Sequence, residues 1–273
     1  MKAHELCFSL LLVGIMGVLG GCRHADEKLC LTKVVDMNKS DKYVWKLEYD
    51  DSHRLVGYGD TPISYKNGKI MIGGMEWESK GDCMYHATFQ QNREGEYESE
   101  SFCRINMGGN YVDAWKKTAF RNTPDTLFVV SDYYLEGMEK PVRKVVAKYV
   151  YDDKNRLTEI LTVYYDGGEE TGACHCYYGY NANIRYESNL NLQAFLVDRE
   201  GLDTFFYLLL DLGKRRMCVT LPDQIRHCVN RGKAIYEADG LYRLDGSAPS
   251  KMEVISLQTE LKARYELEHL VLD

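Results

Sequence analysis

A phrase of seven residues occurs twice in this 273-residue chain, and it constrains the fold more than any other feature. Tyr-Asp-Asp-x-x-Arg-Leu occupies residues 49–55 and again residues 151–157. Each copy follows a strand-like run, and its aspartates can close a turn by accepting hydrogen bonds from nearby backbone N–H groups. Such a loop also needs a residue in the left-handed conformation, which suits Asn155 and, less comfortably, His53 in the first copy. Both copies therefore predict a β-hairpin.

Weaker forms of this turn recur at residues 65–69, 165–168 and 236–240. Asn67-Gly68, in the first of them, is a strong signal for a two-residue hairpin loop. Between the turns, apolar and polar residues alternate, most clearly over residues 144–151 and 261–268. A period of two is typical of half-buried antiparallel strands. We therefore expect most of the chain to be a meander of hairpins.

Two stretches depart from this alternation. Residues 202–212 carry Leu202, Phe205, Phe206 and Leu209 at helical spacing, and Gly213 follows where a helix would end. Residues 111–120 show a weaker helical pattern. The predicted fold is mainly β: a large curved antiparallel meander sheet or incomplete barrel with one or two covering helices.

The start of the chain predicts a lipoprotein precursor. An apolar run at residues 6–19 has the length of a signal-peptide core, and Leu19-Gly20-Gly21-Cys22 resembles the lipobox of lipoprotein signals. The alternative is an ordinary secretory signal with a chance cysteine. We expect a signal peptide at residues 1–21, a lipidated tether at residues 22–30 with the lipid on Cys22, and a single β-rich domain at residues 31–273.

The predicted location is the outer membrane, lipid-anchored, on its periplasmic or cell-surface face. Asp26-Glu27 resembles the acidic surface-export signal of Bacteroidetes lipoproteins, although a plain solvated tether explains the pair equally well. The membrane is thus a partner through the anchor. The net charge of −7, without a basic cluster, argues against nucleic acid as a partner. We expect a monomer, and the seven cysteines beyond Cys22 leave at least one outside any intrachain disulfide.

Several short sequence phrases occur in an order that resembles a family of Bacteroidetes lipoproteins. This family is known only as a domain of unknown function with a porin-like fold. The matching residues are the two Tyr-Asp-Asp phrases, residues 188–192, Leu212-Gly213-Lys214, residues 221–225, Asp239-Gly240 and Lys251-Met252. The resemblance covers about residues 30–270. The sequence departs from the family in its many cysteines and in the degenerate repeats between residues 70 and 130. It implies a curved sheet of Tyr-Asp hairpins and an envelope location, but no activity. A second, weaker resemblance is to the Tyr-Asp repeats of bacterial toxin shells.

The commonest hydrolase, metalloprotease and nucleotide-binding motifs are absent from the sequence. Cys174-His175-Cys176 could give a metal two thiolates from one strand face, but structural zinc sites space their cysteines by two to four. The turn aspartates lack the ligand spacing of a calcium loop. We therefore expect no catalytic residue, no cofactor and no metal site, and Cys22 as the one modified residue.

Three functions stay open at this point. The leading hypothesis is a non-catalytic outer-membrane or cell-surface lipoprotein that binds or scaffolds an unknown ligand; the 21 tyrosines would suit a glycan, and a lipid is the other option. The second is a carrier of lipid or another apolar ligand, held between the sheet and the helix at 202–212. The third is a hydrolase whose site is assembled from separated residues.

Overall fold

A computed structural model describes residues 28–36, 43–73, 85–107, 110–180, 190–191, 193–194, 201–213, 222, 224–229, 233–239, 241–245, 248–255 and 262–272. The strands are β1 (Lys28–Asp36), β2 (Tyr43–Tyr49), β3 (Leu55–Tyr58), β4 (Thr61–Lys66), β5 (Lys69–Ile72), β6 (His86–Gln91), β7 (Tyr97–Met107), β8 (Asn110–Asn122), β9 (Thr126–Tyr134), β10 (Arg143–Tyr151), β11 (Leu157–Asp166), β12 (Glu169–Gly179), β13 (Gln224–Val229), β14 (Lys233–Asp239), β15 (Leu241–Asp245), β16 (Ala248–Ile255) and β17 (Lys262–Leu272). The one α-helix within the described ranges is α2 (Leu202–Leu209).

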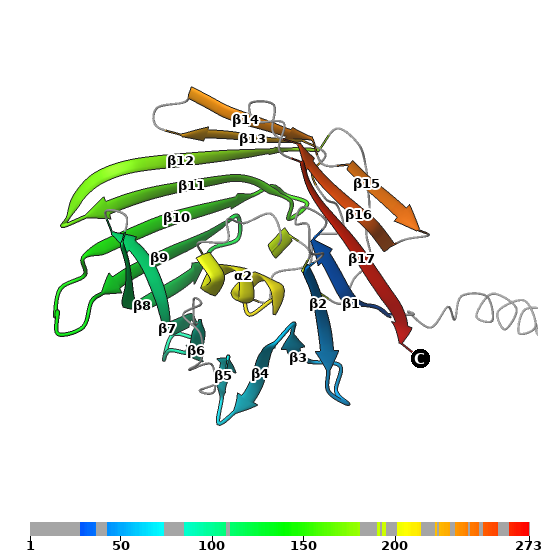
Figure 1. Ribbon diagram of the computed structural model, residues 1–273, viewed down its shortest axis with the longest axis horizontal. Helices are drawn as coiled ribbons and strands as arrows, with labels where there is room; N and C mark the ends of the chain where they lie inside the picture. The colour runs from blue at the N-terminus through cyan, green and yellow to red at the C-terminus, as the bar shows by residue number, and fades with distance from the viewer. Residues whose placement is uncertain are drawn as a thin grey trace, which may run out of the picture.

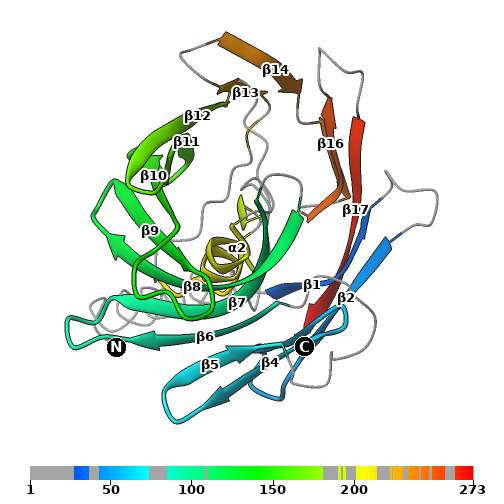
Figure 2. The same cartoon turned by 60° about the vertical axis from the view of Figure 1, so that its left-hand side comes forward.

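These strands form one curved antiparallel sheet, as predicted (Figure 1). Pairing follows chain order from β1 to β14, and β17 returns to pair with β1, placing Lys28 opposite Leu272. No register within the described residues joins β14 to β15, and the sheet is not closed there (Figure 2). Because neighbours are antiparallel, β1 and every odd-numbered strand as far as β13 begin at the same end of the sheet. We call this end the turn end, since both Tyr-Asp-Asp turns lie there, and the opposite end the loop end.

The two Tyr-Asp-Asp phrases form the same turn, which confirms the predicted hairpins. The side chain of Asp152 accepts hydrogen bonds from the backbone N–H of Lys154 (3.0 Å) and Arg156 (2.9 Å) and from Arg156 Nε (2.6 Å). Asp50 accepts the corresponding bonds from Ser52 and Arg54 at 3.0, 2.9 and 2.8 Å. His53 and Asn155 have φ angles of 58° and 59°, so both take the left-handed conformation.

Each repeat also includes a tyrosine from further along the chain. The guanidinium of Arg54 lies 4.7 Å from the ring centroid of Tyr65, and Arg156 lies 4.7 Å from that of Tyr180. The two tyrosine hydroxyls donate to the backbone oxygens of Leu55 and Leu157, at 2.9 and 2.7 Å respectively. The repeated unit is therefore larger than its sequence phrase, because a tyrosine that follows the phrase further along the chain completes it.

The core lies on the concave face of the sheet, around α2 (Figures 1 and 2). An eight-residue helix is marginal by itself, so α2 depends on its packing. The ring of Tyr207 stacks on Phe120 with centroids 4.1 Å apart, while Phe206 stacks on Tyr85 and meets the edge of Tyr58. Buried residues occur all around the helix, which is typical of a helix enclosed by its domain rather than one lying on its surface.

The helix predicted at 111–120 is wrong, since these residues belong to β8. Their burial alternates strictly, with Ala114, Lys116, Thr118 and Phe120 inward and the residues between them outward. Lys116 and Thr118 are polar but buried, because their partner is a carboxylate on α2. Because the inward face of β8 is partly polar, apolar and polar residues do not alternate along it, and the sequence gives no strand signal.

The helix predicted at 202–212 is confirmed, although it ends at Leu209. The left-handed residue after it is Asp211, with a φ of 47°, and not Gly213. A Cβ on Gly213 would lie 2.7 Å from the hydroxyl oxygen of Tyr207 and 2.6 Å from Asn122 Nδ2. Gly213 is therefore required by close packing rather than by its φ angle.

Several predictions fall outside the described residues: the signal peptide at 1–21, Cys22, the acidic pair Asp26-Glu27, and Gly240 of the last weak hairpin. In the part of the chain that the structure describes, no helix is both long and apolar enough to cross a bilayer.

Candidate functional site

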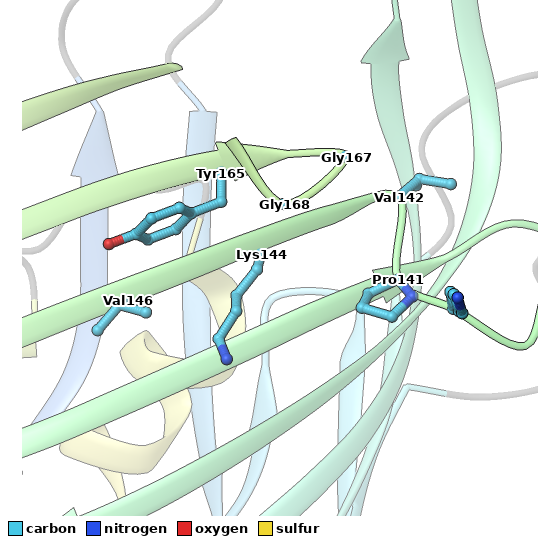
Figure 3. A pocket seen from close by; sticks show the side chains of 8 residues that line it. Pro141, Val142, Lys144, Val146, Tyr165, Gly167 and Gly168 are labelled. Carbon is cyan, nitrogen blue, oxygen red and sulfur yellow. The ribbon is translucent and has the colours of Figure 1, made fainter. Parts of the chain in front are cut away.

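A pocket of about 520 Å³ lies on the outer face of the sheet at its loop end (Figure 3). The 135–142 loop, between β9 and β10, and the Gly167-Gly168 turn, between β11 and β12, form its edges. Lys144 and Tyr165 face each other across the β10–β11 register and extend along the pocket, with Val146 beyond them. Because alternate residues Ala147 and Tyr149 are buried in the core, Lys144 and Val146 point outward. We call this the basic pocket.

A second pocket of about 440 Å³ lies on the other side of the same loop. Its floor is Trp115 on β8 and Tyr134 on β9, which are opposite each other in the β8–β9 register. Lys117 and the exposed loop residues Glu136 and Met138 complete its walls. The 135–142 loop thus separates a basic pocket from an aromatic one, which we call the Trp115 pocket.

The strands hold Trp115 in position even though half of it is exposed to solvent. His86, Phe102 and Trp115 follow one another across β6, β7 and β8 in register. His86 stacks on Phe102 at a centroid distance of 5.4 Å, and both rings meet the indole edge to face, at 5.8 and 5.2 Å. Such ring pairs add to simple burial and restrict the side chain. The indole is therefore a preformed platform.

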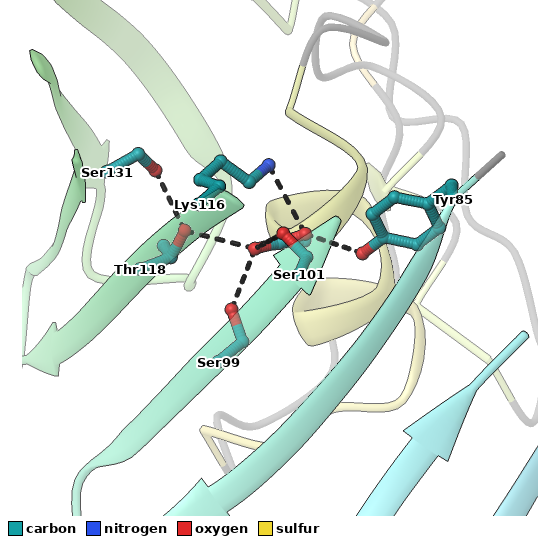
Figure 4. A network of polar contacts seen from close by, with 7 residues as sticks. Tyr85, Ser99, Ser101, Lys116, Thr118 and Ser131 are labelled. Atoms are coloured by element: carbon teal, nitrogen blue, oxygen red, sulfur yellow. Dashed lines mark hydrogen bonds and ion pairs between the residues drawn. The ribbon is translucent and has the colours of Figure 1, made fainter. Parts of the chain in front are cut away.

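On the inner face, the carboxylate of Asp203 forms the centre of a buried polar network (Figure 4). It accepts hydrogen bonds from Tyr85 (2.5 Å), Ser99 (2.8 Å), Ser101 (3.0 Å) and Thr118 (3.0 Å), and Lys116 Nζ lies 3.2 Å away. Burial alone would raise the pKa of Asp203, but the ammonium of Lys116 and the donated hydrogen bonds outweigh it. The pKa therefore lies below the ordinary carboxyl value, and Asp203 is ionised at neutral pH.

This network fixes α2 within the sheet, and its two charged groups are buried. Asp203 is 1% exposed and Lys116 is 3% exposed, and donors on β7, on β8 and at Tyr85, just before β6, satisfy the carboxylate. Ionised Asp203 also stands in the first turn of α2, where a negative charge is favoured by the helix dipole. The arrangement is that of a structural attachment point.

Cys174-His175-Cys176 lies on β12. On the outer face, His175 Nε2 lies 2.6 Å from Glu159 Oε1, and its Nδ1 lies 2.8 Å from the Tyr177 hydroxyl. This trio is partly exposed on a strand face and lines neither pocket. Across the described ranges, no three His, Cys, Asp or Glu side chains are grouped to hold a metal ion.

The comparisons with known proteins agree with this architecture. A protein-family model matches residues 31–267, which is most of the chain. A porin-like protein from Bacteroides vulgatus ATCC 8482 is 38% identical, with a TM-score of 0.79 over 89% of this chain and 99% of its own. The chain belongs to this porin-like family of Bacteroides. A porin-like protein from Bacteroides uniformis ATCC 8492, at 15% identity and a TM-score of 0.52, covers 90% of this chain and 96% of its own and shares the fold. No curated protein matches the chain.

Sequence reasoning missed the residues of both pockets and of the inner network. The lysines at 140 and 144 belong to no sequence motif; Lys144 meets Tyr165 only through strand register, and the 135–142 loop brings Lys140 to them. The network left a fainter signal. Ser99 and Ser101 on one strand, and Lys116 and Thr118 on the next, each share a face at a spacing of two, which would have indicated a polar inner stripe had 110–122 been assigned as a strand.

Proposed function

We propose that this porin-like protein is a non-catalytic, lipid-anchored binding protein of the bacterial outer membrane. The observation that carries the proposal is the pair of solvent-facing pockets on either side of the 135–142 loop. Their floors stand on paired strands, so the aromatic and basic side chains are held in place without a ligand. The residues lining them include no histidine, serine, threonine or cysteine. Such surfaces can bind and orient a ligand, but they offer no serine or cysteine beside a histidine, the pairing that activates those two nucleophiles.

The envelope location is supported by the porin-like relatives and by the lipobox-like Leu19-Gly20-Gly21-Cys22. Each buried methylene of an acyl chain contributes about 0.8 kcal/mol of membrane affinity, so several chains on Cys22 would form a durable anchor. β1 begins at Lys28, at the turn end of the sheet. The two pockets lie at the loop end and would therefore face away from the anchoring membrane.

The two alternative functions have less support. A carrier would need space between α2 and the sheet, yet Phe205 and Phe206 pack against Tyr58 and against each other. A hydrolase would need titratable groups gathered in a cleft, whereas the His175 trio stands on an open strand face.

Replacing Cys22 by serine tests the anchor. The variant should leave the membrane fraction and lose acyl labelling, while Cys30→Ser, a cysteine on β1, should keep both. Unchanged labelling of Cys22→Ser would refute the lipid attachment.

Replacing Asp26 and Glu27 by alanine tests the display at the cell surface. If the pair acts as an export signal, protease accessibility on intact cells should fall while total membrane association stays constant. Equal accessibility would leave the pair as a simple tether.

A further inference from the structure

The basic pocket is electrostatically unusual for this protein. The chain carries a net charge of −7, yet Lys140 and Lys144 both line this one pocket and are both exposed. Within the described part of the chain, no carboxylate forms an ion pair with either ammonium. Three acids lie next to lining residues in the sequence: Asp166 is bonded to Arg143 at 2.8 Å, and Glu139 and Glu169 are exposed and do not line this pocket. The positive charge is therefore available to an anionic ligand.

The remaining walls of the pocket favour a ring rather than a bare inorganic anion. Pro141, Val142 and Val146 supply apolar surface, and the ring of Tyr165 extends beside Lys144 with its hydroxyl on the side of Val146, away from the Gly167-Gly168 turn (Figure 3). A pyranose presents an apolar C–H face and a polar rim, so its ring can pack on these side chains while an anionic substituent meets the lysines. A free phosphate would leave the apolar walls unused.

The Trp115 pocket extends this surface to a second unit. It lies just across the 135–142 loop and offers a fixed, half-exposed indole. Lys117 beside it is paired with Glu100 at 3.3 Å, and Glu136 and Glu139 also line it, so this pocket suits the uncharged face of a sugar rather than a second anionic group. Two ring-sized platforms separated by one loop match a polymer better than a single sugar.

We propose that this surface binds an acidic polysaccharide, with a carboxylate- or sulfate-bearing sugar in the basic pocket and a neighbouring sugar on Trp115. The inference rests on the proposed binding function and specifies its ligand class. An anionic lipid headgroup shares the chemistry of the charged group, but the loop end lies opposite the end where the tether enters β1. The observations therefore favour a polymer outside the anchoring membrane.

The test uses the full lipidated protein in phosphatidylcholine vesicles, with polygalacturonate and chondroitin sulfate as ligands and dextran as the uncharged control. The wild-type protein should bind at least one of the acidic polymers and not dextran. Lys140→Gln combined with Lys144→Gln should weaken binding by about tenfold, as expected for the loss of charge-assisted contacts at a partly exposed site. Lys148→Gln is the matched control, since Lys148 points outward from the same strand but contacts Phe128 instead.

Two further variants and a competition experiment make the test specific. Tyr165→Ala and Trp115→Ala should each weaken binding of the polymer, whereas Phe128→Ala, another exposed aromatic on the outer face, should not. Galacturonate should displace the polymer better than glycerol 1-phosphate, the phosphatidylglycerol headgroup. No binding of either acidic polymer, equal losses in Lys148→Gln, or better displacement by glycerol phosphate would each overturn the ligand class. None of these outcomes would affect the acyl labelling of Cys22, which tests the anchor separately.

Discussion

Two aspartates organise different regions of this molecule with the same chemistry. Asp152 at the turn end accepts three hydrogen bonds, all from residues within four positions of it in the sequence. Asp203 accepts its bonds from β7 and β8 and from Tyr85, across separations of 85 to 118 residues. The difference is one of range. A carboxylate that orders its own turn is visible in the sequence, whereas one that joins distant strands is not.

The two sites also differ in their exposure to water. Arg156 and Asp152 retain 20% and 19% of their side-chain exposure, and Arg54 and Asp50 retain 55% and 25%. Ion pairs that stay in contact with solvent in this way contribute about 0–1 kcal/mol. Lys116 and Asp203 are almost fully buried, so either charge left without its partner would carry a large desolvation cost. We expect mutations at the two sites to differ accordingly.

Removing the buried cation, Lys116, should give the largest loss of stability. Lys116→Met keeps the length of the side chain but leaves the Asp203 carboxylate without its counter-charge, which typically costs about 3–5 kcal/mol of unfolding free energy. Lys117→Met is the matched control, because the adjacent Lys117 forms an exposed ion pair with Glu100. That control should change stability by about 1 kcal/mol or less. Urea unfolding measures both, and similar losses would show that the buried pair has no special role.

The stability of the wild-type protein and that of the Asp203→Asn variant should respond differently to acid. The folded-state pKa of Asp203 is lowered, so its contribution to stability is complete above the unfolded value of about 3.9 and is lost as pH falls through the folded pKa. Asp203→Asn should therefore lose less stability than the wild type between neutral pH and pH values below about 4. The pKa of Asp50 is also lowered, mainly by its hydrogen bond with the Arg54 side chain, but it titrates in both proteins and cancels. Equal acid dependence in urea unfolding would contradict this assignment.

At the surface turn, the backbone should matter as much as the carboxylate. Asn155 has a φ of 59°, where a β-branched residue meets a steric penalty of about 1–2 kcal/mol. Asn155→Val should destabilise by about this amount, while Asn155→Gly should be neutral or mildly stabilising. Thermal unfolding of the two variants provides the comparison. A harmless valine would mean that the turn relaxes to another conformation.

The first copy of the turn should give the smallest effect. His53 holds the same position with a φ of 58°. Replacement by glycine removes the strain of a side chain in this region but adds freedom to the unfolded chain, so His53→Gly should stabilise by about 0.5 kcal/mol or less. Calorimetry can resolve a shift of this size, and a clear loss of stability would imply that the imidazole has a structural role of its own.

The fold could be predicted to the extent that its determinants are local. The Tyr-Asp-Asp turns, Asn67-Gly68 and the alternation of residues 144–151 each specify a hairpin or strand within a few positions. The strand at residues 110–122 was not predicted, because its inward face carries polar residues. Those residues are there to bind Asp203, which lies far away in the chain. The basic pocket was equally hidden, since Lys144 and Tyr165 come together only through strand pairing.

The seam between β1 and β17 sets an order on folding. Lys28 and Leu272 face each other across it, so this pairing closes by far the longest loop in the sheet, while the other registers join strands that follow one another in the chain. Closing a long loop costs more chain entropy and slows the contacts that depend on it. The hairpins can therefore form early and independently, whereas the seam must wait until β17 has been synthesised. Until then, β1 has an unpaired edge, the part of a nascent sheet most prone to pair with the wrong chain.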